Sequence, residues 1–189
     1  MKLDHGPRRS KVPEIAGVER IHIESHADAG GVSTQVFHRE WQLGIHPVQW
    51  NAVQSEANAM RGVHVHVVHE DYVVLLNGQA LLGLRDLRPG APTEGNTVVL
   101  DLKAEPLEAV RIPPGVAHGF YFTRSSLLLN AVSHYWSLAD ELGCHWADPE
   151  LRLDWPVREP LLSQRDASAG SLRELVGTLR TRLQEAAPS

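Results

Sequence analysis

The sequence predicts an all-β fold, a sandwich or barrel of short strands, followed by one C-terminal helix. Between about residues 63 and 131, short apolar or alternating runs are separated by turn residues, which is the pattern of a sandwich or barrel. The C-terminal segment instead places apolar side chains at helical spacing. A chain of 189 residues with 42% hydrophobic residues can bury one core, so we expect a single domain over residues 1–189.

Six segments have the length and composition of strands. They are Val63–Val68, Tyr72–Leu76, Gln79–Leu84, Thr97–Leu102, Ala109–Ile112 and Leu127–Ala131. Asn77 and Gly78 suit a two-residue hairpin turn, while the prolines and glycine of Arg88–Pro92 predict a loop. An earlier strand over Glu19–Glu24 could lie at a sheet edge and pair with a neighbouring copy of the chain.

Two helices are expected at opposite ends of the chain. Arg39–Leu43 followed by Gly44 predicts a short helix that ends at a glycine cap. Ser171 and Glu174 form a capping box, which predicts a C-terminal helix over residues 171–186. Its apolar stripe consists of Leu172, Leu175, Val176, Leu179 and Leu183. We expect this stripe to pack on the wall of the barrel.

Composition excludes several classes of protein. Cys144 is the only cysteine, so no intrachain disulfide can form, and we expect a reducing cytoplasm. No run approaches the roughly 18 apolar residues of a membrane span. The net charge is −5 and the basic residues are scattered, which argues against nucleic acid as a partner.

Three stretches of the chain carry a more specific pattern. The first is Val48-Gln49-Trp50-Asn51 followed by Met60-Arg61-Gly62-Val63-His64; the second joins Leu87–Thr93 to Ile112–Phe120; the third joins His145–Glu150, Asp154–Pro156 and Leu162–Asp166. In this order and spacing, over roughly residues 41–166, they resemble the dTDP-4-dehydrorhamnose 3,5-epimerases. That family inverts the carbons that flank the ketone of a nucleotide-linked 4-keto-6-deoxy sugar.

The resemblance implies both a fold and an activity. The fold would be a cupin, a jelly-roll β-barrel or double-stranded β-helix, with a core from about residue 17 to residue 166, a few short helices and the C-terminal helix. The activity would be that of an isomerase, an epimerase of a dTDP-4-keto-6-deoxyhexose in deoxysugar biosynthesis, serving natural products or a polysaccharide. A homodimer is also implied, and no cofactor is favoured.

The resemblance assigns roles to individual residues of this chain. His64 stands where the family has its base, and Asp166 where it has the carboxylate that orients the base. A carboxylate that accepts the Nδ1 proton would fix the tautomer and make the other ring nitrogen more basic. Arg61 would contact the nucleotide phosphates, a task that suits a guanidinium. Gln49 and Asn51 would line the pocket.

Other positions depart from the family pattern. The lysine that stabilises the enolate oxygen is replaced by Asp71, whose charge would repel a developing enolate. The tyrosine acid is replaced by Asn130, and the second aromatic position reads Trp136, so we expect both to line the substrate site. His118 would lie at the floor or rim of the pocket. The missing tyrosine favours epimerisation at one carbon, or a dehydration or tautomerisation that needs one proton-transfer group.

The same segment permits a second chemistry. His64 and His66 are two residues apart on a predicted strand, so their imidazoles face the same way. Together with Glu70 or Asp71 and with His118 they resemble the metal motif of metal-dependent cupins, which would suit Zn, Fe, Mn or Ni. A metal there would occupy His64, which could not then act as a free base. Two alternatives therefore remain: a metal-dependent cupin enzyme on another small molecule, and a non-catalytic ligand-binding barrel.

Four other potentially reactive residues are expected to have no role in catalysis. His69 is expected to be exposed, one residue past the position that faces away from His66. Glu70 and Asp71, unless they bind a metal, are expected to be solvated turn residues. Cys144 has no neighbour in the sequence that would activate its thiol.

Overall fold

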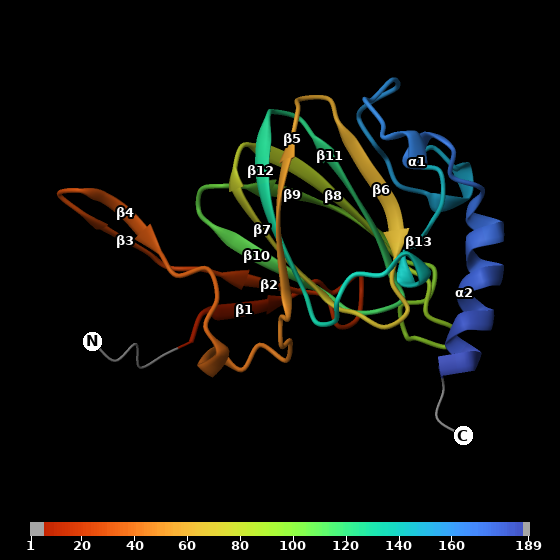
Figure 1. Ribbon diagram of the computed structural model, residues 1–189, viewed down its shortest axis with the longest axis horizontal. Coiled ribbons are helices and arrows are strands. Elements are labelled where there is room, and N and C mark those ends of the chain that lie inside the picture. The colour runs from red at the N-terminus through yellow and green to blue at the C-terminus, as the bar shows by residue number, and fades with distance from the viewer. Residues whose placement is uncertain (1–5, 187–189) are drawn as a thin grey trace.

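The computed structural model describes residues 6–186, which form mostly strands (Figure 1). The strands are β1 Arg8–Lys11, β2 Glu19–His22, β3 Ser25–Asp28, β4 Gly31–Thr34, β5 Gln49–Ser55, β6 Met60–Val65, β7 Asp71–Asn77, β8 Gln79–Asp86, β9 Thr97–Lys103, β10 Glu108–Ile112, β11 Val116–Phe122, β12 Ser126–Val132 and β13 Leu142–Gly143. The helices are α1 Gln164–Ala167 and α2 Leu172–Ala186, with 3₁₀ turns at Arg39–Trp41, Leu138–Asp140 and Pro149–Leu151.

Two antiparallel sheets make the body of the molecule. One has the order β1-β2-β10-β7-β12-β5 and the other the order β13-β6-β11-β8-β9. Most neighbours in each sheet are far apart in the sequence, as in β10 beside both β2 and β7, which is the connectivity of a jelly roll. The predicted jelly-roll class is therefore confirmed, although the two sheets are not joined by hydrogen bonds into a closed barrel.

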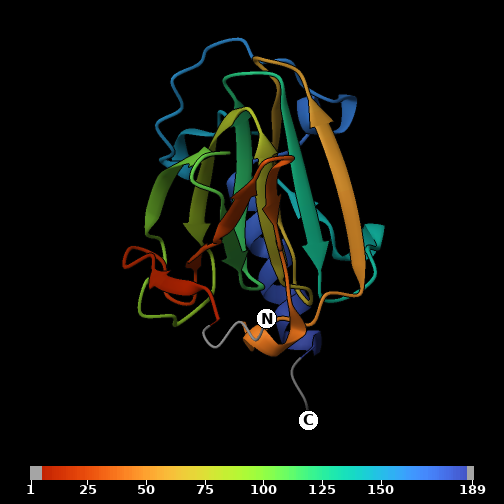
Figure 2. The same cartoon turned by 90° about the vertical axis from the view of Figure 1, so that its left-hand side faces the viewer.

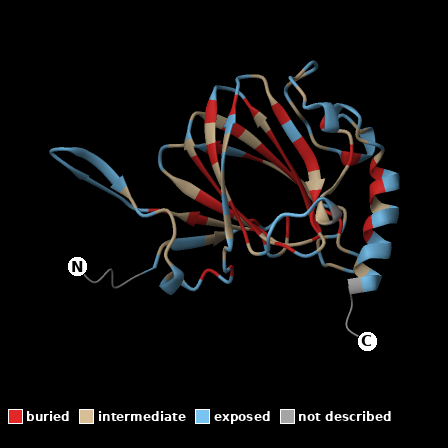
Figure 3. Ribbon diagram, viewed as in Figure 1, coloured by how far each residue is buried: buried red, intermediate tan, exposed pale blue. Residues whose placement is uncertain are grey.

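The core lies between the sheets, under α2, and on the other face of the six-stranded sheet, where Leu43 and Ile45 pack against Tyr72 and Val74. Buried strand residues line the inner faces, while β3, β4 and the outer side of α2 are exposed (Figure 3). Leu172, Leu175 and Leu179 of α2 pack in one cluster with Met60 and Val63 of β6. This packing covers the outer side of β6, so the opposite side chains of that strand face the space between the sheets.

The C-terminal helix begins at the predicted capping box. The backbone N–H of Ser171 donates to Glu174 Oε2 at 2.8 Å, and the N–H of Glu174 donates to Ser171 Oγ at 3.3 Å. The helix stands on the opposite side of the strands from the β3–β4 hairpin (Figure 2). No helix in the described part of the chain has the length and apolarity to span a membrane.

The predicted strand Val63–Val68 is shifted in the structure, because β6 begins at Met60 and ends at Val65. The N–H groups of Val67 and Val68 donate instead to Asp140 Oδ1, at 2.7 and 3.1 Å. A side-chain carboxylate thus takes hydrogen bonds that another strand would have taken, and it bends the chain into the turn before β7.

The early strand does not lie where we expected. β2 covers Glu19–His22 and is flanked by β1 on one side and β10 on the other. It is therefore an interior strand, and its edge is not free to pair with a neighbouring copy. The outer strand of this sheet is β1.

The short helix near residue 40 also differs from its prediction. It is one 3₁₀ turn over Arg39–Trp41. Gln42, with φ 50°, ends it in the left-handed conformation two residues before Gly44.

Candidate active site

A pocket of about 450 Å³ lies between the inner faces of the two sheets. One wall comes from β5 and β12, with Asn51, Val53, Leu128, Asn130 and Val132. The facing wall comes from β6, β11 and the turn after β6, with Arg61, His64, His66, His69, His118 and Phe120. Trp136, Glu141, Ser163, Arg165 and Asp166 complete the lining from the segments that follow the sheets.

Gly62 allows Arg61 and His64 to line the same pocket although they are three residues apart. The pairing of β6 with β11 shifts register here, from His118 opposite His64 to Phe120 opposite Arg61. Gly62 has φ +105°, and a Cβ on it would lie 2.9 Å from the carbonyl oxygen of His118. This position therefore requires glycine, and the irregularity reorients one half of the strand relative to the other.

His64 and Asp166 are in direct contact, as the sequence predicts. Asp166 Oδ1 lies 2.8 Å from His64 Nε2, whereas we expected the carboxylate at Nδ1. Burial alone would raise the pKa of Asp166, but the hydrogen bond and charge of His64, together with Ser163 and Arg165, lower it to about 2. Asp166 is therefore ionised at neutral pH, and it holds the proton of His64 on Nε2.

Arg165 and Glu141 cover the same imidazole. Arg165 Nη1 donates to Glu141 Oε1 at 2.6 Å, and Arg165 Nη2 lies 2.6 Å from His64 Nε2. A guanidinium can only donate, so it competes with the proton that Asp166 requires on that nitrogen. With the proton on Nε2, where the carboxylate of Asp166 accepts it, the lone pair is on Nδ1, which lies 3.4 Å from Arg165 Nη2 and 3.6 Å from Glu141 Oε1.

The predicted phosphate ligand Arg61 borders the pocket. Its Nε donates to Ser55 Oγ at 2.8 Å, and its Nη2 donates to the carbonyl oxygen of Gln54 at 3.1 Å. These bonds orient the guanidinium and leave its other N–H groups able to reach a bound anion.

Gln49 does not line the pocket but connects two residues that do. Its Nε2 donates to Asn51 Oδ1 at 3.0 Å, and its Oε1 accepts from the backbone N–H of Trp136 at 3.0 Å. Gln49 thereby fixes the position of both neighbours on this side of the pocket.

Asn130 and Trp136 both face the pocket, as expected. Asn130 Oδ1 is buried and has no hydrogen-bond partner among the described residues. The indole Nε1 of Trp136 donates to Glu141 Oε2. Tyr135 does not line the pocket and is 77% exposed.

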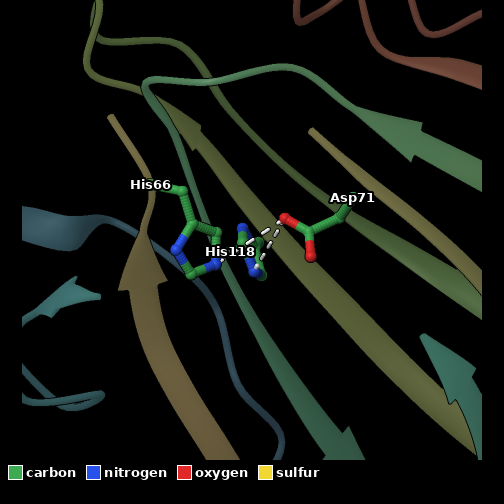
Figure 4. A group of neighbouring side chains, drawn as sticks. All are labelled: His66, Asp71 and His118. Atoms are coloured by element: carbon green, nitrogen blue, oxygen red, sulfur yellow. Dashed lines mark ion pairs between the residues drawn. The ribbon is translucent and has the colours of Figure 1, made fainter. Parts of the chain in front are cut away.

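Two other histidines of the pocket, His66 and His118, lie buried beside Asp71 (Figure 4). Asp71 Oδ2 lies 3.7 Å from His66 Nε2 and 3.8 Å from His118 Nε2. Asp71 is only 2% exposed, so the expectation of a solvated turn residue was wrong. It is the first residue of β7 and points into the interior.

His69 was expected to be exposed, but it is 2% exposed. Its Nδ1 lies 2.8 Å from Asp140 Oδ2, and its ring stacks on that of His66 with the centroids 3.7 Å apart. Asp140 therefore draws His69 inward, an effect that the spacing of residues along the chain does not reveal.

The metal ligands predicted from the sequence do not assemble as a set. Glu70 is bound by Arg111, whose Nη2 donates to Glu70 Oε1 at 2.5 Å, and His64 is held by Asp166. The structure instead groups His66, Asp71 and His118, whose potential ligand atoms lie within 4.8 Å of one another.

Burial sets the protonation of this cluster. Burial first, and then the charges of His118 and His69, lower the pKa of His66 to about 2. Burial also lowers the pKa of His118 and raises the pKa of Asp71. His66 and His118 are thus neutral, in contrast to the charged pairs around His64.

Sequence reasoning missed Arg165, Glu141 and Asp140. Arg165 precedes the predicted Asp166, but nothing in the sequence indicates that its side chain reaches His64. Glu141 and Asp140 lie in a segment without regular spacing between β12 and β13. Cys144 is buried, and burial raises the pKa of its thiol to about 12. This supports the expectation that the Cys144 thiol is not activated.

Comparison with known proteins gives a consistent result. The family model described as dTDP-4-dehydrorhamnose 3,5-epimerase matches residues 13–174. A dTDP-4-dehydrorhamnose 3-epimerase from Streptomyces niveus is 34% identical over 169 residues, which cover 85% of this chain and 82% of that protein.

Solved structures agree with the sequence relatives. A 4-keto-6-deoxy sugar epimerase from the novobiocin biosynthetic gene cluster of Streptomyces spheroides has a TM-score of 0.83 and 32% identity, covering 91% of this chain and 90% of that chain. A 3'-monoepimerase from Streptomyces bikiniensis, in complex with dTDP-quinovose, has a TM-score of 0.78 and 28% identity, covering 89% of this chain and 92% of that chain.

Proposed function

This chain belongs to the dTDP-4-dehydrorhamnose 3,5-epimerase family, and we propose that it epimerises a dTDP-linked 4-keto-6-deoxyhexose at C3, next to the ketone. The observation that carries this proposal is the contact of His64 with an ionised Asp166 inside the pocket. Relatives named as 3-epimerases and as 3,5-epimerases support the reaction class.

His64 acts as the base. Its Nδ1 lone pair takes the proton from C3, and the electrons of the broken C–H bond pass to the ketone oxygen as an enolate. The resulting imidazolium lies between Asp166 at Nε2 and Glu141 near Nδ1, and both carboxylates stabilise its charge. The electrons stay on the substrate, so this proton transfer needs no redox cofactor.

Reprotonation on the other face completes the inversion. Among the described residues that line the pocket, those on β5 and β12 are amides or aliphatic side chains, and none is ionisable. A water molecule admitted from solvent supplies the proton on that face. Because only one wall carries a base, inversion is confined to a single carbon.

The nucleotide end of the substrate is held by charge and the sugar by amides. Arg61 binds the diphosphate through its free N–H groups. The unpartnered Oδ1 of Asn130 accepts a hydrogen bond from a sugar hydroxyl. The half-exposed ring of Trp136 stacks on the substrate at the side of the pocket that Gln49 orders.

We further propose that the protein is one domain, works in the cytoplasm and assembles as a homodimer. The single, buried Cys144 suits a reducing compartment. The β3–β4 hairpin, which extends from the body of the molecule with exposed residues on both strands, provides a surface for a second copy (Figure 1).

The experiment that tests the reaction is solvent exchange. The protein is incubated with dTDP-4-keto-6-deoxyglucose in deuterated water, and deuterium is located in the sugar by proton NMR. We expect deuterium at C3 and none at C5 beyond the level of a His64→Asn control. Deuterium at both carbons would remove the restriction to one carbon, and deuterium at neither would reject the proposed function.

A further inference from the structure

The buried cluster holds two histidines in one defined tautomer. His66 Nδ1 lies 3.3 Å from the carbonyl oxygen of Asp140, and His118 Nδ1 lies 3.2 Å from that of Val116. A carbonyl oxygen can only accept a hydrogen bond, so each Nδ1 carries the proton. Each neutral ring therefore has its lone pair on Nε2.

Both lone pairs point at the same carboxylate. The two Nε2 atoms lie 3.7 and 3.8 Å from Asp71 Oδ2, beyond hydrogen-bond distance (Figure 4). Asp71 Oδ1 is buried without a hydrogen-bond partner among the described residues. The side chain of Asn130 hydrogen-bonds the Asp71 carboxylate, but no donor joins that carboxylate to either Nε2 lone pair among the described residues, an arrangement that is unfavourable until a cation joins the three acceptors.

The spacing of these acceptors matches a metal site. Ligand atoms bound at about 2.1 Å in a tetrahedron lie about 3.4 Å from one another, within a few tenths of an ångström of the distances to Asp71. Two imidazoles and one carboxylate are a common ligand set for divalent transition metals. Histidine ligands usually donate their other N–H to a carbonyl or carboxylate, as His66 and His118 do.

We propose that His66, His118 and Asp71 bind one divalent transition-metal ion of the Zn²⁺, Fe²⁺, Mn²⁺ or Ni²⁺ class in the wall of the pocket. His66 follows β6, His118 lies on β11 and Asp71 begins β7, so the fold brings together ligands from three segments. His64 is not a ligand. A metal and a free base can therefore occupy one pocket, which the ligand set read from the sequence did not allow.

The ion also has a task, which rests on the proposed function. His66 and His118 line the pocket, so an ion held by them would lie in its wall, within reach of a bound substrate. There the ion binds the ketone oxygen as a Lewis acid and stabilises the enolate that forms when His64 removes the proton. The binding of the ion itself does not depend on this role.

A proton on Asp71 is the competing explanation for the cluster. A protonated carboxyl could donate to one imidazole and leave no place for a metal. Metal binding by the intact protein separates the two cases: a metal site takes up about one ion per chain and releases any proton on Asp71, whereas a carboxyl–imidazole pair that only stabilises the fold takes up far less than one ion per chain.

The test uses untagged protein that has been treated with a chelator and dialysed. Co²⁺ is added, and binding is followed by visible absorption and by elemental analysis. We expect about one Co²⁺ per chain, displaced by Zn²⁺. Asp71→Asn and His66→Gln should each weaken binding about 100-fold or more, while His26→Gln, which removes an exposed histidine on β3, should bind normally.

The outcomes are distinct. Wild-type protein that takes up far less than one ion per chain would overturn the site even if the variants failed to fold. Equal binding by Asp71→Asn, with its folding checked by circular dichroism, would also overturn it. If metal-free and reloaded proteins exchange deuterium at C3 equally, the Lewis-acid role is rejected and the site stands; if neither exchanges, the proposed function fails independently of the site.

Discussion

His64 and His66 are two residues apart and line the same pocket, but their surroundings differ in every respect. His64 lies among charged groups, with an ionised Asp166 at one nitrogen and the Glu141–Arg165 pair beside it. His66 lies deeper, neutral, between a backbone carbonyl and the buried carboxyl group of Asp71. The partner of each ring, and not its place in the motif, decides whether it suits proton transfer or cation binding.

The largest effect should come from replacing the base. His64→Asn removes the imidazole that is hydrogen-bonded to the ionised Asp166, and we expect kcat for epimerisation to fall about 10³-fold. Stopped assays of product epimerisation measure this directly. If His64→Asn kept most of its kcat while His66→Gln lost it, the two rings would have exchanged roles and the comparison would be reversed.

Removing the partner of the base should cost less. Asp166→Asn keeps the shape of the side chain but loses the charge that stabilises the imidazolium, so we expect kcat to fall about 10²-fold with little change in KM. Asp154→Asn, which changes an exposed aspartate outside the pocket, is the matched control and should retain kcat. Equal losses in the two variants would show that Asp166 acts on the fold and not on His64.

Arg61 should affect binding more than chemistry. Arg61→Ala removes a charge-assisted contact to the diphosphate, and we expect KM to rise about 10-fold to 100-fold while kcat changes little. Arg124→Ala removes an exposed arginine outside the pocket and should leave KM unchanged. A fall in kcat with unchanged KM would place Arg61 beside the reacting carbons, on the side of His64.

The smallest effect concerns stability in acid. The pKa of Asp166 is about 2 in the folded protein and 3.8 in the unfolded chain. The contribution of Asp166 to the free energy of unfolding is therefore present above pH 3.8 and is lost as the pH falls toward 2. We expect wild type to exceed Asp166→Asn in free energy of unfolding by about 2 kcal/mol at pH 6, and this excess to vanish near pH 2. Urea unfolding at both pH values measures it. An excess that does not depend on pH would mean that Asp166 is not ionised beside His64.

The fold and half of the site could be predicted from the sequence. Alternation and turn residues indicated β2, β6 to β10 and β12 but not β1, β5 or β11, and the capping box of Ser171 and Glu174 indicated α2. The motifs placed Arg61, His64, His118 and Asp166 in one pocket, and the structure brings all four to its lining.

The rest depends on contacts that periodicity does not encode. Alternation states which face a strand residue occupies, but not which loop closes over that face. Asp140 captures the amides of Val67 and Val68 and draws His69 inward, so two predictions failed through one carboxylate. Asp71 looked like a solvated charge because its partners, His66 and His118, come from other strands and loops.

The most direct test of this division of roles is the tautomer of each histidine in the metal-free protein. Long-range ¹⁵N–¹H correlation spectra of histidine-labelled protein report which ring nitrogen carries the proton, with signals assigned through the His64→Asn and His66→Gln variants. We predict that His66 and His118 carry it on Nδ1 and His64 on Nε2. A spectrum in which all three rings share one tautomer would contradict the separation of a proton-transfer site from a cation site.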